Sequence, residues 1–369
     1  MISEKITIIG GGNGGFASAA DLTLRGHQVT LFEMPEFGDS VSAIKEKGGI
    51  ELEVVPGNDL DGGFAKLHCI TTDIEEALSD ADIVIVIAPA YAHAAMAEVA
   101  APYVRDDMII VLSPANFGGS ITFREALMKH GCSAKVKVSE FDCLMYGTRK
   151  KDDLSVLIRA YKHNVGCASF PSNGSDAIFE RLKGIYPHII KRDNVLETGL
   201  SNLNTYGHPV WMIGNIYNLD KEVDQVIREG KTDSICKMRD GIDAEHMRLR
   251  EIGLDVQSIG EIFLSYYKYQ GYNGESTTKF WQNTRLHDNK APIEIKHRFL
   301  TEDVPFGLVP LEELLAQYDL PSPLTTGVIN IASFLCEEDF RETGMKLEQV
   351  GIKGLTADEL KTFLRYGER

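Results

Sequence analysis

Apolar, β-branched runs alternate with helix-compatible segments through the first half of the chain. Residues 82–88 form a continuous apolar run after an initial Asp, as is typical of a strand buried on both faces. Residues 108–112 repeat this pattern. Strands are also expected at residues 5–9, 28–32, 50–55, 135–140 and 156–160 and near Cys167, and helices at residues 13–25, 40–47, 89–104 and 122–129. This alternation predicts a doubly wound parallel sheet.

The pattern changes near residue 194, where long amphipathic segments replace the apolar runs. Helices are expected at residues 243–255, 256–269, 311–318, 323–335 and 356–364. No alternating strand pattern of any strength accompanies them. The sequence therefore predicts an α/β domain over residues 1–192 and an all-α, mostly helical domain over residues 193–369.

A glycine cluster follows the first predicted strand directly. Gly10, Gly12 and Gly15 match G-x-G-x-x-G, and a helix is expected to begin beside them. The first glycine allows a tight turn, the second lets a pyrophosphate approach the backbone, and the third lets the helix pack closely on the sheet. The helix N-terminus then faces the phosphates. This context predicts a Rossmann-type dinucleotide-binding domain.

The second predicted strand ends in Glu33, at the distance where an acidic side chain meets an adenine ribose. Its carboxylate would accept hydrogen bonds from the ribose hydroxyls and repel a 2′-phosphate, so NAD is favoured over NADP. In a parallel sheet ligands gather at the carboxyl ends of the strands. Asn116, in the segment after residue 112, is therefore a candidate substrate-binding residue. The candidate cofactor-binding residues are Gly10, Gly12, Asn13, Gly14, Gly15, Glu33 and Pro89.

Composition and charge narrow the classes of function. The 369 residues carry a formal net charge of −16, which argues against nucleic acid or an anionic membrane as the main partner. No apolar run approaches the ~20 residues of a membrane-spanning helix, and no signal peptide is expected before the first strand. The six cysteines lack the spacing of metal ligands. We therefore expect a cytoplasmic enzyme with reduced thiols and no metal.

The second half contains a polar group within an apolar segment. Asn204 and His208 would share one face of a helix at i, i+4, and Pro209 is expected to break that helix. A histidine there could act as a general acid or base, but a structural, hydrogen-bonded histidine is an equally good interpretation. His93, after the strand that ends near Pro89, competes with it. Three further histidines are expected on the surface or in loops: His27, His130 and His188.

A third segment, residues 298–310, contains Arg298 and Asp303, five residues apart, and is broken by two prolines and a glycine. This composition predicts a shaped loop. A local ion pair on the surface is the simpler alternative, and the residues alone leave both interpretations open.

Taken together, these motifs resemble the octopine/nopaline-type opine dehydrogenase family along almost the whole chain. The resemblance rests on residues 10–15, 202–204, 208–209, 302–303, 307–310, 321–324 and 354–356, in this order and spacing. It implies a dinucleotide-binding domain followed by a helical domain. It also implies a reductive condensation of an amino acid with a 2-keto acid, pyruvate being the simplest, by a reduced nicotinamide cofactor.

The resemblance also implies roles for individual residues. The catalytic histidine–aspartate pair of the family falls on His208 and Asp303. The arginine that binds a substrate carboxylate falls on Arg298, and Asn204 matches a polar residue of the same site. Glu33 is one methylene longer than the Asp often found there, so NADP remains the less favoured alternative. A homodimer is possible.

Two other functions remain open. A reductase of a simple 2-oxo acid or keto phosphate could use the same fold, but such enzymes generally rely on a catalytic lysine, and no lysine neighbours His208 in the sequence. A non-catalytic nicotinamide sensor would bind the cofactor and turn over nothing. The polar residues around His208 and Asp303 argue against the sensor.

Overall fold

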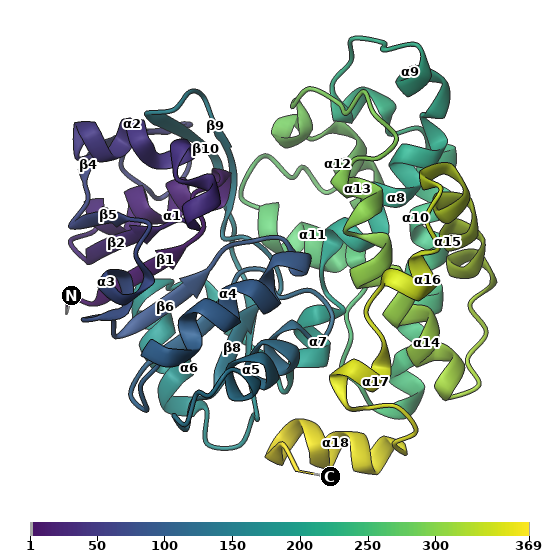
Figure 1. Cartoon of the computed structure of the whole chain (residues 1–369). Coiled ribbons are helices and arrows are strands. Elements are labelled where there is room, and N and C mark those ends of the chain that lie inside the picture. Colours follow the sequence, from purple (N-terminus) through teal and green to yellow (C-terminus); the bar gives the residue numbers. More distant parts are fainter. Residues whose placement is uncertain (1–2, 369) are drawn as a thin grey trace. The chain divides into compact units, whose positions relative to one another are not determined.

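The computed structural model describes residues 3–368, and these residues form two compact units (Figure 1). The first unit comprises the described residues up to Val195 together with residues 365–367, and the second comprises the described residues from Leu196 onward outside that short segment. The boundary near Arg192 between a dinucleotide-binding domain and a helical substrate domain stays a prediction.

An eight-stranded sheet forms the centre of the first unit, with strand order β12-β11-β8-β7-β6-β1-β2-β5. From β8 to β5 all neighbours are parallel, whereas β11 runs antiparallel to β8. Ile9 of β1 lies in register with Phe32 and Val86, so β1, β2 and β6 end at the same edge. The strands are β1 (Lys5–Ile9), β2 (Gln28–Phe32), β5 (Cys69–Thr71), β6 (Ile83–Val86), β7 (Ile109–Leu112), β8 (Val138–Phe141), β11 (Val165–Phe170) and β12 (Ile189–Lys191).

A second, four-stranded sheet has the order β4-β3-β10-β9. The prediction that residues 50–55 and 156–160 belong to the one parallel sheet is wrong, because both lie here. β3 alternates buried apolar residues with acidic ones, a pattern typical of a strand with a single buried face. The strands are β3 (Gly49–Val54), β4 (Gly63–Lys66), β9 (Tyr146–Lys150) and β10 (Ser155–Tyr161).

The helix α1 (Asn13–Leu24) packs against strands of both sheets. Residues 14–22 are all buried, which follows from contact on two opposite sides. Glycine, alanine and serine dominate this helix, and their small side chains let both sheets approach it closely. The start of α1, and with it the glycine cluster, is therefore held from two directions.

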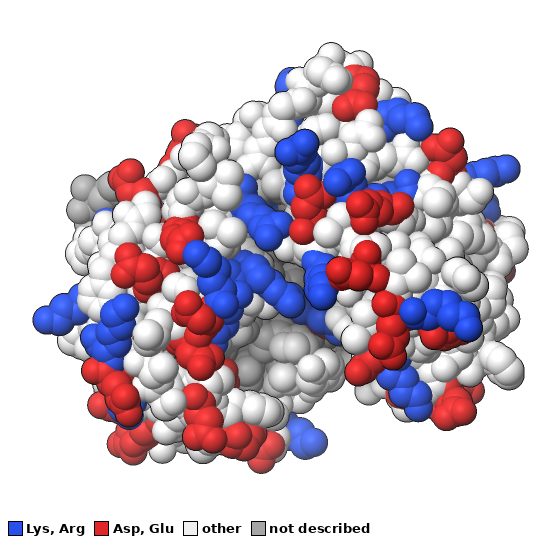
Figure 2. Space-filling view, turned by 90° about the horizontal axis from the view of Figure 1, so that it is seen from above, with Lys and Arg blue, Asp and Glu red and all other residues white. Residues whose placement is uncertain are grey.

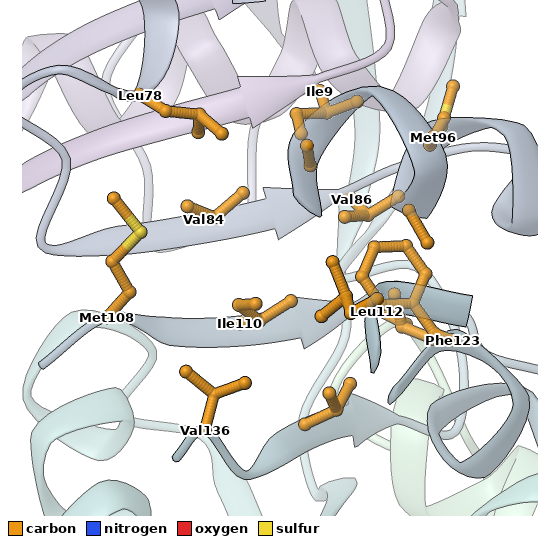
Figure 3. Close-up of a cluster of buried hydrophobic side chains, with 14 of the residues drawn as sticks. Ile9, Leu78, Val84, Val86, Met96, Met108, Ile110, Leu112, Phe123 and Val136 are labelled. Atoms are coloured by element: carbon orange, nitrogen blue, oxygen red, sulfur yellow. The ribbon is translucent and has the colours of Figure 1, made fainter. Parts of the chain in front are cut away.

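One hydrophobic core cluster of the first unit lies between the central strands and two helices, α4 (His93–Ala100) and α5 (Gly119–Lys129) (Figure 3). Val86 of β6 and Leu112 of β7 lie beside the ring of Phe123. The continuous apolar runs of these strands are thus explained, since helices cover them. The remaining helices of the first unit are α2 (Asp39–Lys47), α3 (Ile74–Leu78) and α6 (Asp176–Ile185).

The second unit is helical, and within its described residues the only β pairing outside a named strand is a single bridge between Val226 and Lys290. The helix predicted at residues 243–255 is the end of a longer helical stretch: α10 begins at Asp233, where the Thr232 hydroxyl accepts the N–H of Ile235, and ends at His246. A 3₁₀ helix, Met247–Ile252, follows it. The helices are α7 (Val195–Gly199), α8 (Leu203–Gly214), α9 (Ile216–Asp220), α10 (Asp233–His246), α11 (Ile259–Tyr267), α12 (Thr277–Asn283), α13 (Arg298–Thr301), α14 (Val309–Gln317), α15 (Pro323–Cys336), α16 (Phe340–Thr343), α17 (Leu347–Val350) and α18 (Ala357–Tyr366).

The surface and the helix lengths bear on possible partners. Acidic and basic side chains both occur across the face seen in Figure 2. Over the described part of the chain, no helix combines the length and the apolar character that crossing a bilayer requires.

The core of the first unit can be tested through α5. Phe123 is 1% exposed and Met128, on the same helix, is 56% exposed. Phe123→Ala should lower the free energy of unfolding by about 3–5 kcal/mol, because it leaves a cavity in the core. Met128→Ala, the matched control, should change it by less than about 0.5 kcal/mol. Urea denaturation followed by circular dichroism measures both, and equal losses would contradict the assignment of this core.

Candidate functional site

The glycine cluster makes a tight turn between β1 and α1. Gly10 has φ +113°, and a Cβ there would lie 2.3 Å from the carbonyl oxygen of Ile87. A Cβ on Gly15 would lie 1.7 Å from the carbonyl oxygen of Gly10. A Cβ on Gly12, in contrast, would meet no atom within 4 Å. Protein packing therefore explains Gly10 and Gly15, whereas Gly12 borders open space at the N-terminus of α1, where a phosphate fits.

Glu33 lies at the end of β2 and is bound to this turn. One carboxylate oxygen accepts the Gly11 N–H at 2.7 Å, and the other accepts the Met34 N–H at 2.8 Å. The side chain is 8% exposed. A carboxylate offers about four acceptor positions, so these two bonds fix its orientation and leave capacity for ribose hydroxyls.

Lys150 of β9 also belongs to this site, and no sequence pattern indicated it. Its backbone N–H donates to Asn13 Oδ1 at 2.8 Å, and its Nζ lies 3.7 Å from the ring centre of Phe16. Burial lowers the pKa of Lys150, and the charges of Asp153 and Glu33 oppose that shift. Asn13 thus ties the glycine turn to the second sheet, and Lys150 brings a cation close to it.

The strand end near Pro89 contains a histidine with a structural role. Pro89 precedes the 3₁₀ turn Ala90–Ala92, and His93 Nε2 lies 3.2 Å from the carbonyl oxygen of Ala88, to which it can donate. Burial lowers the pKa of His93 to about 4. A neutral, buried imidazole bound to the backbone is a poor candidate for acid–base catalysis at neutral pH.

Three other residues of the first unit were singled out from the sequence: Asn116, Gly14 and His27. Asn116 follows β7 with φ +58° and is buried. Gly14 packs on Ile87, because a Cβ there would lie 2.8 Å from the Ile87 side chain. His27 lies in the connection between α1 and β2, as expected of a loop residue, but it is buried, and its Nδ1 accepts the N–H of Glu4 at 3.2 Å.

In the second unit His208 and Asp303 are adjacent, although 95 residues separate them in the chain. His208 Nδ1 lies 2.8 Å from Asp303 Oδ2. The Asp303 side chain is 4% exposed and that of His208 is 23% exposed. Phe299 stacks on the imidazole, with ring centres 3.5 Å apart and planes 14° from parallel. The ring is therefore held by a carboxylate at one edge and an aromatic face.

Local structure around two helical segments explains this contact. The Asn202 side chain caps α8 by accepting the N–H of Asn204. The break expected at Pro209 is wrong, since α8 continues to Gly214. Asp303 precedes the π-helix Val304–Leu308, and a Cβ on Gly307 would lie 2.4 Å from Thr205 Oγ1. Glycine at that position lets the π-helix approach α8 closely enough for the pair to form.

The pairing determines which imidazole nitrogen can act on a substrate. An ionised carboxylate can only accept hydrogen bonds, so Nδ1 of a neutral His208 must carry the proton. Nε2 is then the basic nitrogen of the ring. A histidine–carboxylate pair of this kind can accept a proton at Nε2 while the aspartate stabilises the resulting imidazolium.

Arg298 has a partner other than a substrate. Its Nη2 lies 2.8 Å from Glu302 Oε2, and its side chain is 53% exposed while that of Glu302 is 4% exposed. The sequence left a local ion pair between Arg298 and Asp303 open as the simpler alternative, but Arg298 pairs with Glu302 instead, and Asp303 pairs with His208. The guanidinium has five N–H donors, so the pair with Glu302 leaves several of them for a ligand.

Comparisons with known proteins relate both units to dehydrogenases. A family described as NAD/NADP octopine/nopaline dehydrogenase, alpha-helical domain, matches residues 191–336. A family described as NAD-dependent glycerol-3-phosphate dehydrogenase N-terminus matches residues 5–114. The opine dehydrogenase of Arthrobacter sp. (strain 1C) is 30% identical over 366 residues, which cover 98% of this chain and 98% of that protein. The octopine dehydrogenase of Pecten maximus is 25% identical over 345 residues, 84% of each chain.

Solved structures confirm the predicted fold class. A structure of octopine dehydrogenase with NADH and L-arginine matches with a TM-score of 0.77 at 20% identity, covering 100% of this chain and 99% of that one. The Rossmann-type domain followed by a helical domain is therefore the architecture of this chain as well.

The open space at Gly12 can be tested with two glycine variants. Gly12→Ala should keep the melting temperature of the wild type, because its Cβ meets no protein atom within 4 Å, yet weaken NADH binding about tenfold or more, or ~1.4 kcal/mol. Gly15→Ala should lose folding stability, since its Cβ would overlap the backbone of Gly10. Fluorescence titration with NADH and thermal denaturation measure the two effects. Unchanged NADH affinity in Gly12→Ala would remove Gly12 from the cofactor site.

Proposed function

The chain belongs to the opine dehydrogenase family, and we propose that it joins the amino group of an amino acid to a 2-keto acid, with NADH as the reductant. Pyruvate is the simplest keto acid for this reaction, and the reverse oxidation follows from its reversibility. The single observation that carries the proposal is the His208–Asp303 contact of 2.8 Å, because it supplies the acid–base group that imine chemistry needs.

The residues of the first unit fit a nicotinamide dinucleotide. The turn at Gly10, the open backbone at Gly12 and the N-terminus of α1 suit a pyrophosphate. Glu33 suits the adenine ribose and disfavours a 2′-phosphate, which supports NAD over NADP. Lys150 weakens the preference for NAD over NADP, because it places a positive charge near Glu33. When bound, the reduced cofactor supplies the hydride.

His208 serves the proton transfers in this proposal. Imine formation from an amine and a ketone removes protons from nitrogen and releases water, and reduction leaves a nitrogen that takes up a proton. Nε2 of His208 is the group that accepts and returns these protons, and Asp303 keeps the ring in the tautomer with Nε2 free of hydrogen. Stacking on Phe299 fixes the plane of the ring.

Three polar residues are proposed to bind substrate. Arg298 would hold a substrate carboxylate through parallel hydrogen bonds, with Glu302 orienting the guanidinium from behind. Asn204 lies one turn before His208 on the same helix face, and Asn116 provides an amide in the first unit.

Arg298→Lys should raise KM for the keto acid, and wild-type kinetics in Arg298→Ala would exclude the contact.

The cellular compartment and the oligomeric state are also proposed. All six cysteines are free thiols in the structure, which supports a reducing, cytoplasmic compartment. Cell fractionation tests this placement, and recovery in an oxidising compartment would contradict it. A homodimer is proposed from the resemblance alone, and light scattering of the purified protein decides it, a monomer mass being the opposing result.

The proposed reaction is tested by measuring NADH and NADPH oxidation across twenty amino acids and several 2-keto acids. We expect oxidation that requires both substrates, prefers NADH, and yields an N-(carboxyalkyl) amino acid detectable by mass spectrometry. Oxidation with a keto acid alone, unaffected by any amino acid, would favour the simple reductase. Cofactor binding without any turnover would favour a sensor.

His208 and Asp303 are predicted to act as one unit. His208→Ala and Asp303→Asn should each reduce kcat about a hundredfold or more, the scale of general acid–base groups. The double variant should be little slower than the slower single variant, because both residues serve the same step. NADH affinity should stay unchanged in all three. Additive losses, or a His208→Ala enzyme of wild-type rate, would refute the joint role.

A further inference from the structure

Two histidines and an aspartate converge in the first unit, and none of them is a residue of the candidate site described above. Asp59 lies in the connection between β3 and β4, His163 in the connection between β10 and β11, and His188 just before β12. Each imidazole Nε2 lies 4.0 Å from Asp59 Oδ2. The ligand atoms of all three side chains lie within 4.8 Å of one another.

Backbone structure brings the two histidines together. β11 and β12 are parallel neighbours, with Val165 in register with Ile189. His163 and His188 precede these two residues closely, so they meet at the same end of the two strands. Their rings stack with centres 3.9 Å apart and planes 19° from parallel. Tyr161 contacts both rings edge-on, at 6.4 and 5.3 Å.

Asn58 attaches the loop that carries Asp59 to the same region. Its Oδ1 accepts the N–H of Tyr161 at 2.8 Å, and its Nδ2 donates to the carbonyl oxygens of Val55 and Arg159. The position of Asp59 therefore depends on β10, the strand that leads to His163. Three segments distant in the sequence are held so that two imidazoles face one carboxylate.

The spacing of these atoms is informative. A distance of 4.0 Å between Nε2 and Oδ2 is too long for a direct hydrogen bond. A divalent transition metal binds imidazole nitrogen and carboxylate oxygen at about 2.0–2.2 Å, so neighbouring ligand atoms around it lie roughly 3–3.5 Å apart. The observed spacing is longer than this by less than 2 Å, and the Asp59 side chain is 76% exposed.

We propose that Asp59, His163 and His188 form a binding site for one divalent transition-metal cation of the zinc class. Two imidazole nitrogens and one carboxylate oxygen provide three ligands, and water completes a tetrahedron. The cation would join loops of both sheets of the first unit, since Asp59 belongs to the smaller sheet and His188 to the larger. Its role is stabilisation of this unit, and it takes no part in the proposed reaction.

Metal binding to the chelator-treated full-length protein tests the site. Equilibrium dialysis against Zn²⁺ should give one tightly bound ion per chain, and Zn²⁺ should raise the melting temperature by several degrees through preferential binding to the folded state. Mg²⁺ should do neither, because imidazole suits softer cations. The single variants His163→Ala, His188→Ala and Asp59→Asn should weaken binding at least tenfold. His130→Ala, which removes a histidine 3.6 Å from Glu98, is the matched control and should bind as the wild type does.

Cobalt provides a second readout that separates this site from the cysteines. Co²⁺ bound here should give visible absorption of a four-coordinate ion without the intense near-ultraviolet band of a thiolate ligand. Circular dichroism establishes that each variant is folded, and Asp59→Asn, at an exposed position, is the variant least prone to unfold. The proposal is overturned if no saturable binding occurs, if a thiolate band dominates, or if the three single variants bind as tightly as His130→Ala does.

Discussion

The hydrogen bond between His208 Nδ1 and Asp303 Oδ2 is the interaction on which the proposed chemistry depends. A free imidazole exchanges its proton between two nitrogens, whereas a ring bound to a buried carboxylate keeps the proton on the nitrogen facing that carboxylate. The other nitrogen then has a defined role. Gly307 lets the π-helix lie close to Thr205 on α8, the helix that carries His208, because a Cβ there would lie 2.4 Å from Thr205 Oγ1. A backbone feature thus contributes to the orientation of the His208 ring.

In the first unit a comparable constraint acts through α1. Both sheets pack on this helix, and its small side chains allow that approach. Gly15 lets the helix begin against the carbonyl of Gly10, and Asn13 binds the backbone of Lys150 in the second sheet. The direction of the α1 N-terminus is therefore set by packing on two sides rather than by the glycine turn alone.

The sequence predicted features that depend on neighbouring residues in the chain. The apolar runs of β6 and β7 and the glycine pattern before α1 report local structure, and the predicted fold class is confirmed. Pairing between distant segments is harder. The pattern of residues 50–55 predicts a strand, and we assigned that strand to the parallel sheet. The assignment is wrong because the pattern of one strand does not indicate which strand it pairs with.

The same limit applies to the site. Lys150 contacts the glycine turn from a strand of the second sheet, and no local sequence pattern predicted that sheet. Arg298 pairs with Glu302, whereas the sequence analysis considered only Asp303 as its ion-pair partner. Helix α8 continues past Pro209 despite the missing N–H, because packing of its apolar face outweighs the local preference. The contact of His208 with Asp303 was predicted only from the family resemblance.

The most direct test of the central claim is the protonation of the His208 ring, measured by ¹⁵N NMR at a pH where the ring is neutral. The His208 signals are identified by their absence in His208→Gln. We expect the proton on Nδ1 in the wild type, and a shift of the proton to Nε2 in Asp303→Asn, because the amide can donate to Nδ1. A proton on Nε2 in the wild type, or the same tautomer in both proteins, would contradict the account.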